Sequence, residues 1–408
     1  MLLPSQRHLL ASMILLLSLL GLGVGYGGPS AVVTGASAVG ICCSLLCLTR
    51  VHDRPRQERR DIATVSQVVA PAAQPLGDRS SSDDLVHKIV HQGRYAILLT
   101  RQTAGTLTEE EFAWAIDAFQ GGMALVPEGD VEVYNDREFV ADDGSEGTAD
   151  RSPSGRVFRV EPFFLDRYPV TNRQYHEFVA AGGYREIALW DKRIWPAVLD
   201  MVDQTGLPGP RFWKNGCCLS GEEELPVVGI SWFEAAACAR WMCKRLPTDA
   251  EWVKAASWPV PIDAKTLAQR RYPWGDTMDR ARANVWGSGP NRIVAVHEFA
   301  EGASVGGIYQ LIGNVWEWTA GDFLVGSSGG DLELPTPMKS VRGGAFDTYF
   351  DSQARTQLQS GENPLSRRHN IGFRCAIAMR DVVLVQPPSD APPTCPGPVL
   401  GEHKETAS

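Results

Sequence analysis

The clearest hydrophobic pattern in the chain lies at residues 308–318, which read IYQLIGNVWEW. Gly313 and Asn314 favour a sharp turn, and the alternation after them predicts a strand with Trp316 and Trp318 on one face and Glu317 on the other. Two interpretations stay open. The tryptophans can simply anchor a core, or backbone carbonyls at the turn can join Glu317 in an oxygen cage for a hard cation such as calcium.

Further helices are predicted by capping boxes, in which Thr or Ser is followed three residues later by Glu or Gln. The pairs are Thr108 with Glu111, Thr171 with Gln174, Ser231 with Glu234, and Thr248 with Glu251. They predict helices that end near residues 119, 179, 244 and 256, and another helix is expected from residue 84. Glycine-broken or alternating patterns predict strands at 340–346 and 371–377, and YPWG at 272–275 predicts a turn.

Two uncharged apolar runs near the N-terminus, 9–24 and 30–49, predict a membrane element, because each approaches the ~17–25 residues needed to span a bilayer. Arginines flank the pair on both outer sides. This favours two transmembrane helices in a hairpin over residues 1–50, with the globular part in the cytoplasm. The alternative is a signal peptide over 9–25, which would export the rest. Residues 51–83 are predicted to be a polar linker.

The remaining chain is predicted to form a short helical region at 84–120, a loop-rich α+β domain at 121–380 and a disordered tail at 381–408. The 40 glycines and 12 tryptophans fit a domain whose turns depend on glycine and whose loops are anchored by aromatic residues. A net charge of −9 argues against a nucleic-acid partner. His87 and His91 lie four apart, but no carboxylate follows at a suitable spacing, so a solvated helical pair is expected there rather than a metal site.

Eight motifs occur in an order that resembles the sulfatase-modifying-factor family, the formylglycine-generating-enzyme-like domain. They are YPVTNRQYHEF, PVVGISWFEAAACARW, KRLPTDAEWVKAA, YPWG, ANVW, GNVWEW, VRGGAF and NIGFRCA. The resemblance covers about residues 121–379. It implies a mixed α/β domain that is rich in loops and related to the C-type lectin fold. With the predicted hairpin, it indicates a membrane-anchored member of bacterial type.

The resemblance also identifies the positions at which active formylglycine-generating enzymes carry two cysteines, which bind copper and oxidise a substrate cysteine. These positions fall on Thr348 and Gln353. Neither side chain supplies the thiolate that selects copper(I), so a copper cofactor and the formylglycine reaction are not expected. The nine cysteines form no CxxC pair, so neither a zinc ribbon nor a disulfide framework is indicated. In an iron-dependent branch of the family the metal comes from a histidine-rich bundle, whose only counterpart here is His87 with His91.

Family members hold two structural calcium ions, and the resemblance transfers both sets of ligands to this sequence. The first set is Gln310, Gly313, Val315 and Glu317, and the second is Asn284 with Val285. Gln310 keeps an oxygen donor but is one methylene longer than the family residue. The loop after Trp286 offers no aspartate for the second ion, so one calcium is expected.

Two functions from different classes stay open. The first is a membrane-tethered module that binds a peptide, protein or small molecule through loops at 346–368. The second is an oxidoreductase of the same family that uses other residues near the same cleft. The candidate residues are Asp347, Tyr349, Arg355 and His369. A flat aromatic surface near Gly343 and Gly344 would favour binding, and a concave surface with titratable groups would favour catalysis.

Overall fold

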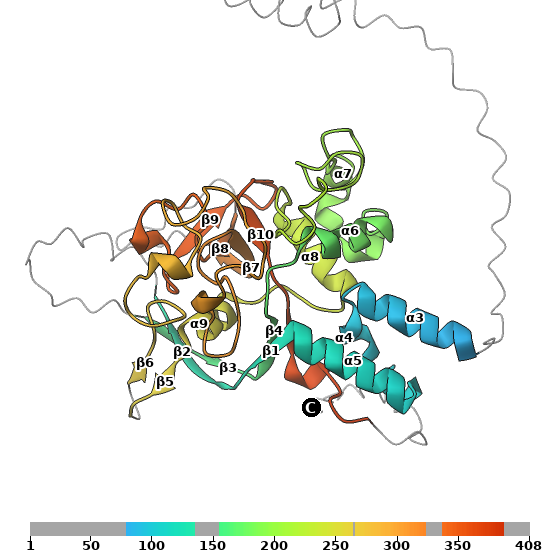
Figure 1. The fold of residues 1–408 in the computed structure, drawn as a ribbon, viewed down its shortest axis with the longest axis horizontal. Coiled ribbons are helices and arrows are strands. Elements are labelled where there is room, and N and C mark those ends of the chain that lie inside the picture. Colours follow the sequence, from blue (N-terminus) through green and yellow to red (C-terminus); the bar gives the residue numbers. More distant parts are fainter. Residues whose placement is uncertain (1–78, 135–154, 264–265, 324–336, 387–408) are drawn as a thin grey trace, which may run out of the picture. The chain divides into compact units, whose positions relative to one another are not determined.

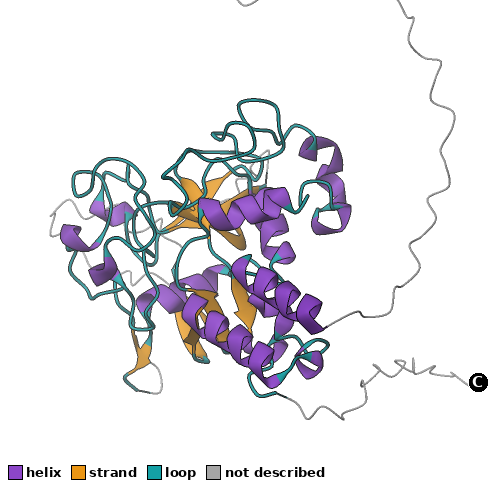
Figure 2. Ribbon diagram, turned by 45° about the vertical axis from the view of Figure 1, so that its right-hand side comes forward, coloured by secondary structure: helices purple, strands orange, loops and turns teal. Residues whose placement is uncertain are grey.

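The computed structural model describes residues 79–134, 155–263, 266–323 and 337–386 (Figure 1). Short helices and short strands are joined by long loops in this part of the chain, as the sequence predicts (Figure 2). The predicted hairpin, most of the predicted linker and the end of the predicted tail lie outside the described residues. Among the helices that are described, none is long and apolar enough to cross a membrane.

The helices are α3 (Arg79–His91), α4 (Tyr95–Leu98), α5 (Glu109–Gly122), α6 (Asn172–Ala180), α7 (Trp195–Val198), α8 (Trp232–Trp241) and α9 (Asp249–Ser257). The strands are β1 (Met123–Val126), β2 (Gly129–Val133), β3 (Arg156–Val160), β4 (Phe163–Asp166), β5 (Val260–Pro261), β6 (Leu267–Ala268), β7 (Trp316–Phe323), β8 (Met338–Arg342), β9 (Gln359–Glu362), β10 (Ile371–Phe373) and β11 (Ala376–Ala378).

Two sheets organise the fold. One has the order β10-β7-β8-β9, with β10 parallel to β7 and the other neighbours antiparallel, and the other has the antiparallel order β1-β4-β11. Strands β2 and β3 pair with each other, as do β5 and β6. The strand predicted at 371–377 is divided between the two main sheets, because the chain leaves the first sheet after Phe373 and joins the second at Ala376.

All four predicted capping boxes are present, at the starts of α5, α6, α8 and α9. Helix α8 ends at Trp241, earlier than the predicted Lys244. Cys243 takes a left-handed φ of 56°, and the Lys244 N–H donates to the Ala239 carbonyl at 2.8 Å. This closure resembles the glycine-ended Schellman motif. Since no glycine is present, the sequence carries no signal for the stop.

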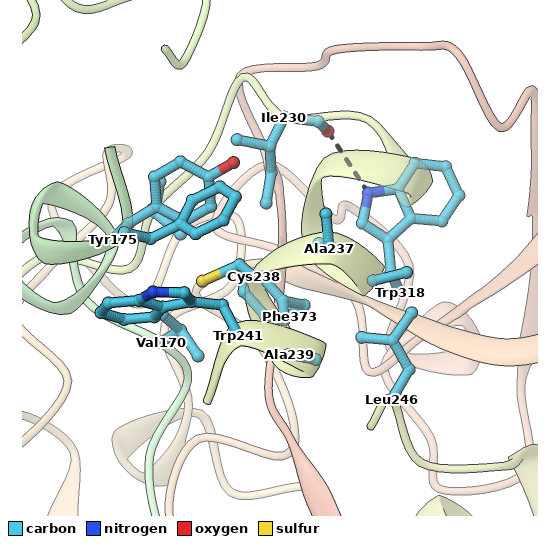
Figure 3. Packing of buried hydrophobic residues seen from close by; sticks show 14 of the residues in the cluster. Val170, Tyr175, Ile230, Ala237, Cys238, Ala239, Trp241, Leu246, Trp318 and Phe373 are labelled. Atoms are coloured by element: carbon cyan, nitrogen blue, oxygen red, sulfur yellow. Dashed lines mark hydrogen bonds between the residues drawn. The ribbon is translucent and has the colours of Figure 1, made fainter. Parts of the chain in front are cut away.

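Strand β7 lies between two hydrophobic cores. Trp318 belongs to the core around α6 and α8, and Trp316 packs against the same core. Figure 3 shows the Trp318 indole beside α8, with its N–H directed at the Ile230 carbonyl 3.4 Å away. Glu317 points to the other side and accepts from Trp252, a member of the second core. The predicted alternation of faces is therefore confirmed.

Helices α3 to α5 share a third core with the β1-β4-β11 sheet, so the prediction of a solvated helical pair is wrong. Phe119 of α5 is fully buried and packs edge-on against Phe164 of β4 at 4.8 Å. Apolar side chains of the three helices pack in this core against Phe164 of β4 and Ile377 of β11, which removes them from water. The chain also stays packed beyond the predicted start of the tail at 381, since the Val383 N–H donates to the Leu99 carbonyl.

Candidate functional site

The turn after β8 holds both positions at which the resemblance implies cysteines. Gly343 and Gly344 have φ values of 96° and 77°, and a side chain at Gly343 would come within 2.5 Å of the Leu311 carbonyl oxygen. The Thr348 hydroxyl accepts from the Ala345 N–H at 2.8 Å, and the Thr348 N–H donates back to the Ala345 carbonyl. Thr348 is buried and closes this turn, whereas Gln353 is exposed. Neither side chain is a nucleophilic thiol.

An exposed group of rings lies beside this turn, and we call Trp286, Tyr349 and Phe350 the aromatic patch. Their exposed fractions are 47%, 61% and 59%. The Trp286 and Tyr349 rings lie 6.3 Å apart, and the Tyr349 and Phe350 rings lie 5.0 Å apart edge-on. Arg280 fixes the edge of the patch, because it donates to the Trp286 carbonyl and pairs with Asp351. The surface at the predicted cleft is therefore rich in aromatic side chains.

Two of the four predicted cleft residues, Asp347 and His369, lie together. The His369 Nε2 is 3.6 Å from an Asp347 carboxylate oxygen, and Asn370 donates to the same carboxylate at 3.0 Å. The Phe346 ring lies 5.9 Å from the His369 ring. Tyr349 is in the aromatic patch instead. Arg355 is half-buried and its Nε has no hydrogen-bond partner in the described structure, so it joins neither group.

His369 also borders a cavity of about 470 Å³ that lies between two loops. We call it the arginine cavity, and its lining residues are Arg211, Phe212, Leu365, Ser366, Arg367, Arg368 and His369. The predicted binding loops at 346–368 already include Leu365, Ser366, Arg367 and Arg368, whereas Arg211 and Phe212 were not predicted. The neighbouring arginines at 367 and 368 were a visible signal, but their proximity to Arg211 depends on a pairing of loops more than 150 positions apart, which no local pattern records.

Three of the four predicted donors at the first calcium site, those of Glu317, Gln310 and Gly313, are already engaged in hydrogen bonds. The Glu317 carboxylate accepts from Arg374 at 2.6 and 2.8 Å and from the Trp252 indole at 2.8 Å. The Gln310 side-chain oxygen accepts from Asn314, and the Gly313 carbonyl accepts from the Val315 N–H. A cation here would face the Arg374 guanidinium. These donors fit calcium poorly, so the ion stays a prediction.

Asn284, from the second predicted calcium site, differs in having a free oxygen. Its Oδ1 is buried and has no hydrogen-bond partner in the described structure, while its amide nitrogen donates to the Arg292 carbonyl and to Asn314. The Val285 carbonyl already accepts from Ser288. Nowhere in the described residues do three or more His, Cys, Asp or Glu side chains group as metal ligands. The ring of His87 instead packs on Trp114 at 4.2 Å.

The family model of the sulfatase-modifying factor enzyme 1-like domain matches residues 116–379, which is more than half of the chain. The chain belongs to this family. Its relatives include both inactive and active proteins by name. The inactive C-alpha-formylglycine-generating enzyme 2 of Bos taurus is 31% identical, with 60% of this chain and 87% of the relative covered. The formylglycine-generating enzyme of Thermomonospora curvata is 30% identical, with 62% and 93% covered.

Hercynine oxygenases are a third kind of relative. That of Mycolicibacterium thermoresistibile is 31% identical, with 56% of this chain and 53% of the relative covered. The chain thus spans about half the length of the hercynine oxygenases that it matches. Among solved structures, PvdO from Pseudomonas aeruginosa matches with a TM-score of 0.41 at 20% identity, over 62% of this chain and 93% of PvdO. The domain has the mixed α/β architecture that the resemblance implied.

Proposed function

We propose that this member of the sulfatase-modifying factor family is a binding module, in which thiol chemistry has been lost and the aromatic patch holds a segment of a peptide or protein. The observation that carries the proposal is the role of Thr348. Its hydroxyl is used in a turn, as the acceptor of the Ala345 N–H, at a position where active formylglycine-generating enzymes need a cysteine. A threonine hydroxyl cannot replace a thiolate as a ligand of copper(I).

The exposure of the aromatic patch supports binding rather than a packing role. Aromatic side chains are enriched in binding surfaces because each buries a large apolar area with little loss of side-chain entropy. Large apolar groups that lie together on a surface mark interaction sites more often than scattered ones do. Phe350 and Tyr349 remain more than half exposed although they contact each other. A ligand with apolar side chains would cover them.

Two further parts of the proposal concern the attachment of the domain to a membrane and the fold that carries its loops. The predicted hairpin at 1–50 would tether the module to a membrane, with the domain on the cytoplasmic side. A relation to the C-type lectin fold would explain why binding residues sit on long loops held by a small sheet core.

The test combines a reaction assay with a binding selection. The full-length protein, supplied with copper, should not convert the cysteine of a sulfatase-type peptide to formylglycine, whereas the T. curvata enzyme should. A displayed peptide library should yield peptides that bind the wild type and lose affinity by about tenfold or more for the Tyr349→Ser, Phe350→Ser double variant. Phe158→Ser, which changes an exposed ring on β3, is the matched control.

Formylglycine formation by the protein would refute the proposal directly. A selection that yields no peptide, or peptides that bind the double variant as well as the wild type, would remove the binding role of the aromatic patch.

A second candidate function is an oxidoreductase with different active-site residues. Relatives of two kinds carry enzyme names, formylglycine-generating enzyme and hercynine oxygenase. The Asp347 and His369 pair offers a carboxylate and an imidazole beside the arginine cavity. Oxygen consumption with added iron(II) and a thiol substrate, abolished by His369→Gln, would favour this function over the binding module.

A further inference from the structure

We propose that the arginine cavity is a binding site for a small organic anion, a carboxylate or phosphate that carries an aromatic or aliphatic group. This site is distinct from the aromatic patch, and its ligand differs in chemistry from the peptide proposed there. Its volume of about 470 Å³ is within the range of small-molecule sites, roughly 300–1,000 Å³.

The charge of the lining selects an anion. Three arginines and a histidine line the cavity and no carboxylate does, although the protein as a whole carries a net charge of −9. Two of the arginines are fixed by partners outside the lining. Arg367 pairs with the buried Glu234 at 2.9 Å and donates to the Val202 carbonyl, and Arg368 pairs with Glu362 at 2.6 Å. The positive charges of Arg367 and Arg368 are therefore largely neutralised by these carboxylates, and the two side chains serve mainly as walls of the cavity.

Arg211 supplies the free charge. Its side chain is exposed, and its guanidinium has no ion pair or hydrogen bond within the described residues. A guanidinium presents paired N–H donors that match the two oxygens of a carboxylate or phosphate. An anion in the cavity could therefore bind Arg211 without breaking an existing ion pair.

The backbone holds the two walls of the cavity in register. The Arg211 N–H donates to the Gly229 carbonyl, and the Gly229 N–H donates to the Arg368 carbonyl, each at 2.8 Å. Gly229 has a φ of 74°, and a side chain there would come within 2.6 Å of the Phe212 ring. The glycine thus allows the loop of Arg211 to lie close to the loop of Arg368. The backbone of the two loops is therefore fixed before an anion binds, and only the Arg211 side chain has to be ordered.

The apolar part of the ligand is indicated by Phe212 and Leu365. Both side chains line the cavity and are exposed. An inorganic anion would leave them in water, whereas an aryl or alkyl group would cover them and gain free energy from the apolar area removed from water. The site therefore favours an amphipathic anion over inorganic phosphate.

The experiment titrates the full-length protein by calorimetry at low ionic strength with four probes: phenyl phosphate, benzoate, inorganic phosphate and neutral phenol. We expect saturable binding of phenyl phosphate or benzoate, and the stronger of the two identifies the anionic group. Inorganic phosphate should bind more weakly and phenol not measurably. Arg211→Gln should weaken binding of the preferred probe by about tenfold, as expected for the loss of one charge-assisted contact.

Two further variants separate the site from general electrostatics. Arg185→Gln removes an exposed charge elsewhere and should leave affinity unchanged. Phe212→Ala should weaken the binding of phenyl phosphate but not the binding of inorganic phosphate. The proposal is overturned if neither phenyl phosphate nor benzoate binds saturably, if inorganic phosphate or phenol binds as tightly as the preferred probe, or if Arg185→Gln lowers affinity as much as Arg211→Gln. These readouts do not depend on the peptide selection at the aromatic patch.

Discussion

Glu317 and Arg374 form an ion pair whose side chains are 1% and 0% exposed. Arg374 also donates to three backbone carbonyls, those of Asp166, Arg167 and Tyr309. Loss of one partner of such a pair leaves a buried charge uncompensated, which costs about 3–5 kcal/mol. We expect Arg374→Met to lower the free energy of unfolding by about this amount, measured by urea denaturation. Arg185→Met, at an exposed position, should change it little. A loss of less than about 1 kcal/mol for Arg374→Met would contradict this account.

The same pair shows what could be predicted at the level of single residues. The sequence places Glu317 correctly on the face of β7 opposite the tryptophans, because that alternation is a local property of a strand. Its partner Arg374 follows 57 positions later and reaches it only because β10 pairs in parallel with β7. The same limit applies to Arg211 and Arg368, whose loops meet through Gly229.

Helix α9 depends at its start on the capping box of Thr248 and Glu251. The Thr248 hydroxyl accepts from the Glu251 N–H at 3.2 Å, and Glu251 is held in turn by Arg245 through two hydrogen bonds. Replacement of a capping Thr by Ala typically costs about 1 kcal/mol. We therefore expect Thr248→Ala to lower the free energy of unfolding by about 1 kcal/mol in urea denaturation. Thr277→Ala, at an exposed turn position, is the control. Equal effects of the two substitutions would show that the cap contributes nothing specific.

Elements were predictable where the signal is local. Capping boxes gave the starts of four helices because the residues that satisfy the first N–H groups lie within one turn of one another. The ends of helices were harder to predict. Helix α8 ends next to Cys243, which adopts a left-handed conformation that nothing in the local sequence predicts. Strand partners could not be predicted at all, since the order β10-β7-β8-β9 is set by contacts between distant segments.

For the whole molecule, the buried groups that hold a proton determine how stability depends on pH. Burial raises the pKa of the Tyr175 and Tyr184 phenols and of the Cys238 and Cys375 thiols well above their ordinary values. Burial alone would lower the pKa of Lys244, but the charge and hydrogen bond of Asp166, together with the nearby Tyr95 and Cys375, outweigh burial and raise the pKa. All five groups therefore keep their protons in the folded state at a pH where an unfolded chain would lose them.

The higher pKa values of these five groups in the folded state than in the unfolded state predict that the protein unfolds in alkali. Unfolded thiols ionise near ~8.5, and unfolded phenols and amines near ~10. Above these values the unfolded state binds fewer protons than the folded state, so the free energy of unfolding falls by about 1.4 kcal/mol per pH unit for each such group. Stability from these groups is fully present below about pH 8.5 and is lost progressively as the pH rises.

Urea midpoints between pH 7 and 11, followed together with the ultraviolet absorbance of phenolate, test this expectation. The midpoint should be nearly constant up to about pH 8.5 and then fall, and the phenolate signal of the buried Tyr95, Tyr175 and Tyr184 should appear only with unfolding. Tyr184→Phe, which removes one of the phenols but also its contact to Glu234, should make the fall less steep, whatever its effect on the midpoint at pH 7. A midpoint that stays constant to pH 11, or full phenolate absorbance while the chain is still folded, would show that the buried phenols do not govern alkaline stability.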